Sequence, residues 1–169
     1  MARTIYGAEL FKSPNLGENY DSSFIGTNSE VITRGAPLSL VGGFVIVNSG
    51  TMSTVGVATA TATMSATNQT VARVKPSFIP IDQEYDFLMG TNADISATNV
   101  GVYYQLTGTS TTIQVDITYG ATTGSSRLVV CSKADPLNEG GTGSGSGARQ
   151  GLFKFVRVSN LKSDGPAAV

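Results

Sequence analysis

From residue 37 onward the chain alternates short apolar runs with clusters of turn residues, and this pattern predicts one strand after another. The run Phe44-Val45-Ile46-Val47 is followed at once by the turn cluster Asn48-Ser49-Gly50. Between residues 55 and 64, Thr and Ala alternate with a period of two, which favours an edge or outer-face strand because such a ladder buries little. Further runs predict strands at 70–75, 78–81, 85–89, 127–133 and 152–158.

The clearest strand covers residues 111–119. Apolar or aromatic residues occupy every second position there and would share one face: Ile113, Val115, Ile117 and Tyr119. Residues 100–106 form a second run, and the segment between the two runs, Thr107-Gly108-Thr109-Ser110, has the composition of a turn. The two runs therefore predict a β-hairpin.

The predicted fold class is all-β: an antiparallel β-barrel or sandwich of about eight to nine strands. The turn signals recur at the spacing of roughly 8–12 residues that is typical of such folds, and no segment has the pattern of a long amphipathic helix. The domain is predicted to span residues 37–160 and to include a Gly/Ser-rich loop at residues 137–150. Residues 161–169 are predicted to form a C-terminal tail.

Residues 1–36 differ from the remainder, because isolated apolar residues are separated there by polar turn residues. No period persists, apart from a possible single turn at residues 8–12. We interpret this segment as an extended N-terminal arm, which could cover its own domain or reach a neighbouring protein. In the second case the contact would be made by its apolar and aromatic residues and one arginine: Arg3, Ile5, Tyr6, Leu10, Phe11, Tyr20 and Phe24.

Composition constrains function mainly by exclusion. The chain has no His, no Trp and a single Cys, and 14% of its residues are charged, where an average domain has about 25%. Without His there is no Ser-His-Asp triad, no imidazole base and no His-ligated zinc, and one Cys forms no disulfide framework. We therefore expect a protein that is not an enzyme and needs no cofactor.

The charge balance gives no support to nucleic acid as a partner. Lys plus Arg number 11 and Asp plus Glu number 12, for a net charge of −1, whereas nucleic-acid binders usually carry a basic excess. The first residues form no apolar secretory signal, and no run approaches the ~18 apolar residues of a membrane-spanning helix. We expect a soluble protein, made in a cytoplasm, without a membrane partner.

One group of carboxylates could bind a metal. Asp82, Glu84 and Asp86 alternate, so their side chains would share a face of a strand and could supply oxygen ligands to Ca²⁺. The favoured alternative is an acidic edge that discourages pairing with other strands.

Two other motifs are interpreted structurally. Gly143-x-Gly145-x-x-Ala148 matches the dinucleotide fingerprint, but it leads into a predicted strand where the fingerprint requires a helix. Cys131 lies in an apolar run and is predicted to be a buried, unreactive thiol.

The second half of the chain resembles the head decoration proteins of tailed bacteriophages. The resemblance begins with Phe78-Ile79-Pro80 and Tyr85-Asp86-Phe87 and continues through the turn and strand from Asn92 to Tyr104. It then follows the same order through Leu106-Thr107-Gly108, Arg127-Leu128-Val129-Val130, Ala134-Asp135-Pro136 and Phe153-Lys154-Phe155-Val156. It covers about half of the chain and depends on the order and spacing of turn and strand motifs.

This resemblance implies a virion structural protein that binds the major capsid protein on the outside of an assembled head and stabilises it. It further implies a homotrimer near capsid three-fold positions, with an N-terminal segment that reaches the shell, made in the cytoplasm of the host. Two alternatives stay open: a phage tail or head-fibre component, and a β-sandwich module that binds glycans as an adhesin.

Overall fold

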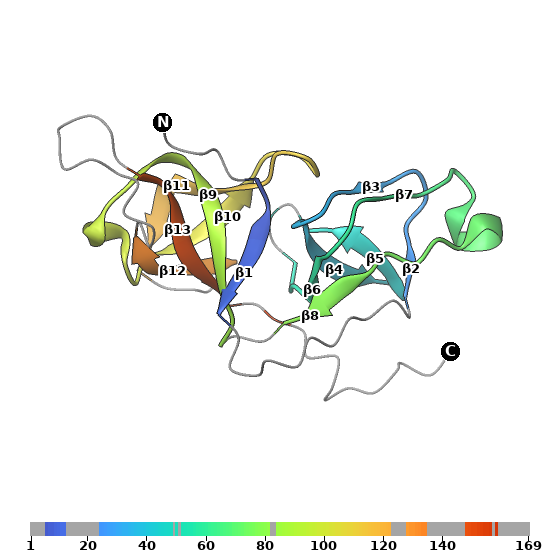
Figure 1. Ribbon diagram of the computed structural model, residues 1–169, viewed down its shortest axis with the longest axis horizontal. Coiled ribbons are helices and arrows are strands. Elements are labelled where there is room, and N and C mark those ends of the chain that lie inside the picture. The colour runs from blue at the N-terminus through green and yellow to red at the C-terminus, as the bar shows by residue number, and fades with distance from the viewer. Residues whose placement is uncertain are drawn as a thin grey trace.

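The computed structural model describes residues 6–12, 24–48, 50, 52–81, 84–122, 128–134, 148–156 and 158. Its strands form two lobes that lie side by side along the long axis of the molecule (Figure 1). We call the group containing β1 and β9–β13 the barrel lobe and the group containing β2–β8 the sheet lobe. The two lobes share one hydrophobic core cluster.

The barrel lobe is a closed five-strand barrel with one additional strand. The order β9-β11-β10-β12-β13 returns to β9, and β1 pairs with β9 as well. Neighbouring strands run antiparallel, except that β9 and β11 are parallel. The strands are β1 (Ala8–Lys12), β9 (Asp86–Ile95), β10 (Tyr103–Thr107), β11 (Gln114–Ala121), β12 (Val129–Ala134) and β13 (Ala148–Phe155).

The sheet lobe contains a five-stranded sheet in the order β2-β5-β4-β6-β8 and a two-stranded sheet formed by β3 and β7. Its strands are β2 (Ile25–Gly26), β3 (Val31–Ile32), β4 (Pro37–Val41), β5 (Phe44–Val47), β6 (Gly56–Ala58), β7 (Ala62–Thr63) and β8 (Phe78–Pro80). A π-helical turn, η1 (Asn68–Ala72), follows β7, and a 3₁₀ turn, η2 (Ala97–Asn99), connects β9 to β10. Within the described ranges, no helix has the length and apolar character to cross a membrane.

Aromatic side chains fill the centre of the barrel lobe. Phe87 and Phe155 meet edge to face with ring centroids 5.4 Å apart, and Tyr104 and Phe153 meet in the same way at 6.4 Å. All four side chains are fully buried. Because β9, β10 and β13 each direct alternate residues inward, three strands place these rings in one interior.

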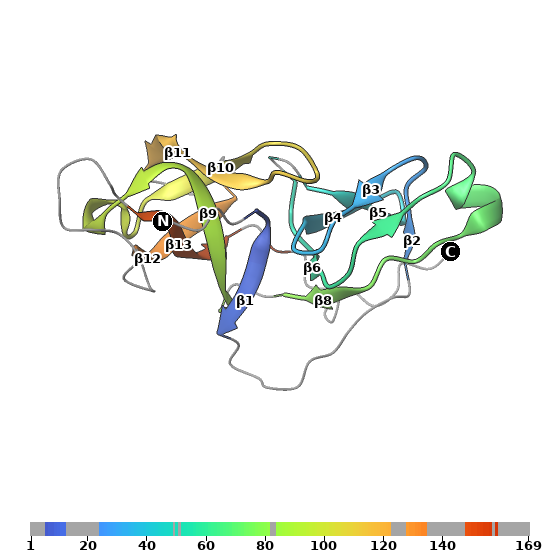
Figure 2. The same ribbon diagram turned by 45° about the horizontal axis from the view of Figure 1, so that its top comes forward.

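Hydrogen bonds join the two lobes. Ala8 N donates to Gly35 O across 2.7 Å, and Thr33 Oγ1 donates to the carbonyl oxygen of Ser110 at the tip of the β10–β11 hairpin. Figure 2 shows this hairpin tip beside the sheet lobe, with β1 at the boundary between the lobes. Gly7 and Gly35 both have positive φ, and a Cβ on Gly7 would lie 2.7 Å from Gly35 O. Glycine is therefore required where the two backbones meet.

The all-β barrel class is confirmed, and so is the hairpin, in which β10 and β11 pair antiparallel. Ile113 and Val115 are buried, but the face that they were predicted to share with Tyr119 leaves the core further along β11, where Tyr119 is 69% exposed. The number of strands differs: thirteen occur among the described residues, because several consist of only two or three residues.

Two predicted strands need correction. The Thr/Ala ladder at residues 55–64 is divided into β6 and β7, and β6 is fully buried between β4 and β8, so it is not an edge strand. Residues 70–75 overlap the π-helical turn η1, in which the carbonyl oxygen of Thr67 accepts the N–H groups of Thr70 and Val71. The side chain of Asn68 stabilises this turn through bonds to Gly26 O and to the backbone of Val74, which local propensity does not anticipate.

The predicted arm also needs correction where the structure describes it. Residues 8–12 are a strand and not a single turn, and the β1–β9 register pairs Leu10 with Phe87. Residues 24–36 contain β2 and β3 and belong to the sheet lobe, so the predicted domain start at residue 37 is too late. The physical reason is long-range pairing, which short segments without an internal period obtain only from distant strands. Residues 1–5, 13–23 and 161–169, and residues 137–147 of the Gly/Ser-rich loop, lie outside the described residues.

Candidate functional site: a groove between the lobes

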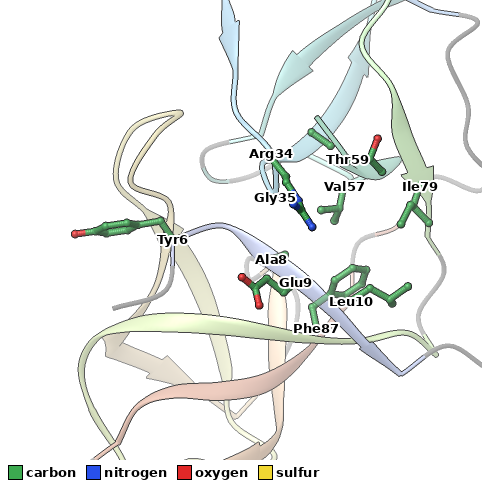
Figure 3. Close-up of a pocket in the computed structure, with 11 residues that line it drawn as sticks. Tyr6, Ala8, Glu9, Leu10, Arg34, Gly35, Val57, Thr59, Ile79 and Phe87 are labelled. Carbon is green, nitrogen blue, oxygen red and sulfur yellow. The ribbon is translucent and has the colours of Figure 1, made fainter. Parts of the chain in front are cut away.

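A groove of about 670 Å³ lies where β1 faces the sheet lobe. Figure 3 shows its two sides, with β1 and Phe87 on one and residues of β6, β8 and the segment before β4 on the other. Its size is within the range of about 300–1,000 Å³ that is common for ligand sites. The lining residues are Tyr6, Ala8, Glu9, Leu10, Arg34, Gly35, Val57, Ala58, Thr59, Ile79 and Phe87.

One side of the groove is the outer edge of β1. This strand is paired with β9 along its other edge, and Ala8 N points away from β9 because it donates to Gly35 O. Since the backbone groups of a strand alternate between its edges, the N–H and C=O of Leu10 point away from β9 too. In the described part of the chain, Gly35 is the one residue that pairs with this edge of β1.

Both polar and apolar groups line the groove. Phe87, Val57 and Ala58 are buried in it, and Leu10 and Ile79 are half-buried at its sides. Thr59 adds a hydroxyl group whose oxygen donates to Ser77 O at 3.1 Å, so it supports the connection between β6 and β8. A Cβ on Gly56 would lie 2.6 Å from Ile79 O, which shows how closely these two strands approach.

Arg34 supplies a positive charge to the groove. Its backbone N–H donates to Thr61 Oγ1 at 3.2 Å, which fixes the segment before β4. The side chain is exposed and extends toward β1 in Figure 3. Within the described ranges, no carboxylate pairs with its guanidinium group. Glu9 also lines the groove and has an interaction of its own.

The predicted contact residues do not form one surface. Tyr6 and Leu10 line the groove, and Tyr6 is 49% exposed. Phe24 instead packs in the sheet lobe, with its ring centroid 6.4 Å from that of Phe78. Phe11 lies within β1, but its side chain is outside the described part. Arg3, Ile5 and Tyr20 lie outside it altogether.

Sequence reasoning missed the other half of the groove. Arg34, Val57 and Ile79 are distant from each other in the sequence and belong to segments without a recognisable motif. The one signal that could have suggested a close approach is Gly35, beside an arginine and immediately before a predicted strand.

The described part of the carboxylate motif contributes one ion pair and two hydrogen bonds. Asp86 Oδ1 accepts a hydrogen bond of 2.7 Å from Ser132 Oγ, and its Oδ2 lies 3.5 Å from Lys154 Nζ. Lys154 Nζ also donates to Glu84 O at 2.8 Å. Both oxygens of Asp86 are thus engaged, which favours a structural role for this carboxylate over metal binding. Asp82 lies outside the described residues.

The ionisable groups outside the groove include a buried thiol and a half-buried carboxyl. Burial raises the pKa of the Cys131 thiol to about 11, and the predicted buried cysteine is confirmed. Burial also raises the pKa of the Glu30 carboxyl, although the Val47 N–H bonded to its Oε1 at 3.0 Å acts in the opposite direction. Its Oε2 is buried without a hydrogen-bond partner in the described part of the chain.

Comparisons with protein-family models, with curated proteins and with solved structures find no match to this chain. Within the described ranges, no three His, Cys, Asp or Glu side chains gather as a metal site would require. Ala148 begins β13, so the glycine-rich motif does lead into a strand and not into a nucleotide-binding helix.

Proposed function

We propose that this protein is a non-enzymatic virion structural protein that decorates and stabilises the outside of a tailed-phage head by binding the major capsid protein as a homotrimer. The observation that carries the proposal is the resemblance to head decoration proteins from Phe78 to Val156. The motifs of that resemblance that the structure describes follow one another along the chain from β8, through the strands of the barrel lobe, to the end of β13.

The position of these motifs supports the proposal. Asp86 begins β9 and Tyr85 directly precedes it, and the segment from Asn92 to Tyr104 includes the end of β9, η2 and the start of β10. Ser96 and Asn99 cap η2 reciprocally, with the Ser96 N–H donating to Asn99 Oδ1 at 2.8 Å. The turn chemistry that carries the resemblance therefore has a defined structural task in this chain.

A comparison of free-energy contributions indicates which contacts would hold such a protein on a capsid shell. Each main-chain hydrogen bond of an added strand contributes about 1 kcal/mol, while ordering each residue costs about 1–2 kcal/mol. Backbone pairing alone therefore roughly cancels. Burial of apolar side chains, at about 1.5–3 kcal/mol each, decides the balance, and three linked copies would raise avidity further.

Cosedimentation tests the proposal. Purified protein is mixed with heads assembled from the major capsid protein of the phage that encodes it, and the pelleted fraction is measured against protein concentration. We expect saturable pelleting with the heads and none without them. A glycan array on the same protein separates the adhesin alternative, which predicts glycan binding and no pelleting.

A further inference from the structure

We propose that a second copy of this chain covers the outer face of the sheet lobe, and that the equivalent faces of the copies meet around the symmetry axis of a homo-oligomer. The outer face is defined by four side chains of β2, β4 and β5: Ile25, Val41, Phe44 and Ile46. In naming the surface between the copies, this inference rests on the homotrimer of the proposed function, but it requires no capsid and is tested without one.

The strand register brings these side chains together. Ile25 lies opposite Phe44 in the parallel pair of β2 and β5, and Phe44 lies opposite Val41 in the antiparallel pair of β4 and β5. Residues that lie opposite each other in neighbouring strands share one face, so three strands contribute to one apolar row. Ile46 is two residues beyond Phe44 and lies on the same face. Figure 1 shows β2 and β5 on the side of the sheet lobe that is farther from the barrel lobe.

The other face of these strands already lies in the core. Leu38 and Val45 are fully buried in the hydrophobic core cluster, and Leu40 packs against it. Among the described residues, the four outer-face side chains lie outside that cluster: Val41 is 48% exposed, and the other three are half-buried. A sheet with one face in water normally carries polar residues there. This part of the sheet is apolar on both faces, so its outer face requires a cover as well.

A neighbouring segment of the chain covers only the border of the outer face. Ser39 lies opposite Ile46 and is 1% exposed, and its hydroxyl donates to Ser53 O at 2.7 Å. Beyond this contact β4 ends, and Gly42 and Gly43 form the turn to β5, where a Cβ on either glycine would meet nothing within 4 Å. The tip of this hairpin is therefore open, which leaves room for the close approach of another backbone.

The distribution of charge identifies the occupant as a second copy. The sequence has no charged residue from Gly35 to Ala72, a range that includes β4 and β5, and none from Ser22 to Ser29 around β2. Around a symmetry axis, equivalent side chains face one another, so a charged residue there would meet a like charge. An uncharged apolar face meets its own copy without repulsion, and it offers a charged partner no group to pair with. The interfaces of homo-oligomers are accordingly more apolar and poorer in charge than the remaining surface.

Sedimentation equilibrium of the full-length protein at several concentrations, without heads, tests the inference. The chain offers a matched pair of positions: Val41 is 48% exposed, and Val100, which follows η2 in the barrel lobe, is 47% exposed. We expect wild type and Val100→Asp to sediment with the mass of three chains. Val41→Asp should raise the dissociation constant at least about tenfold, because it places like charges at the axis.

A mixing experiment separates loss of the contact from loss of the fold. Val41→Asp and Val41→Lys should each associate weakly alone, whereas their mixture should associate more tightly than either, because opposite charges then meet at the axis. Unfolded variants do not give this result. A mixture that associates no better than the separate variants would overturn the meeting of equivalent faces.

The remaining outcomes separate this inference from capsid binding. Wild type that stays monomeric at every concentration, as expected if another segment of the chain or a different protein covers the face, would overturn the inference, as would an oligomer that Val41→Asp does not weaken. Monomeric protein that still pellets with heads would contradict the inference and leave capsid binding intact. An oligomer that Val41→Asp dissociates, but that does not pellet with heads, would support the inference and contradict the proposed function.

Discussion

The backbone N–H of Ala8 donates to the carbonyl oxygen of Gly35 across 2.7 Å, and this bond joins the edge strand of a closed barrel to a second sheet. It places β1 along one side of the groove and the segment that carries Arg34 along the other. The geometry depends on two glycines, because Gly7 and Gly35 approach each other through their backbones.

The close approach at Gly7 is open to a direct test. Gly7 has φ +77° and Gly101 has φ +81°, so both substitutions to Ala carry the same backbone strain of about 1–2 kcal/mol. A Cβ on Gly101 meets nothing within 4 Å, whereas one on Gly7 would lie 2.7 Å from Gly35 O. We expect Gly7→Ala to cost an additional 1–3 kcal/mol or so in urea unfolding. Equal costs for the two variants would show that the lobes do not meet as described.

The half-buried carboxyl of Glu30 should make stability depend on pH. The folded pKa is raised above the ordinary value of 4.5, so as pH rises past that value the unfolded chain loses its proton first. The free energy of unfolding therefore falls until pH passes the folded pKa and is then constant. Glu30→Gln lacks this loss, and its stability relative to wild type should increase between pH 4 and neutrality. Chemical denaturation at several pH values measures the difference, and a parallel pH dependence of the two proteins would contradict it.

The thiol of Cys131 should react slowly in the folded protein. With a pKa raised from 9.0 to about 11, its thiolate fraction at pH 8 is about 100-fold smaller than that of an ordinary thiol. Labelling with a disulfide reagent should accelerate by at least this factor in concentrated urea. The same shift lowers the stability of the folded state as pH rises from 9 toward 11, because the unfolded chain ionises first. Rapid labelling without denaturant would contradict the buried position.

Capsid contact through the groove can be tested with a pair of tyrosines. Tyr6 is 49% exposed at the end of the groove, and Tyr119 is 69% exposed on β11. We expect Tyr6→Ser to weaken head binding in cosedimentation about tenfold and Tyr119→Ser to leave it unchanged. The substitution is preferable to deletion of residues 1–12, because that deletion removes β1 from the barrel lobe. An effect of Tyr119→Ser alone would locate the contact elsewhere.

The sequence predicts best the elements that are determined by local patterns. The alternation in residues 111–119 and the turn before it give the β10–β11 hairpin, and the apolar run around Cys131 gives β12. The prediction of one strand at residues 55–64 fails because a regular alternation of Thr and Ala does not reveal the break between β6 and β7. Burial of β6 between two neighbours is a property of the sheet and not of its own residues.

The candidate site could be predicted only in part. Tyr6 and Leu10 stand out in the sequence as apolar residues in a polar segment, and both line the groove. The remainder depends on pairings between distant segments, such as Leu10 with Phe87, and on the bond between Ala8 and Gly35. No periodicity within a short window encodes contacts of this range.

The most direct test of the proposed function is an image of heads with and without the protein. Heads lacking the protein are incubated with a molar excess of it and compared with untreated heads by cryo-electron microscopy with icosahedral averaging. We expect additional density on the outer surface at three-fold positions, in units of three copies. Unchanged outer density at saturating protein concentration would contradict it.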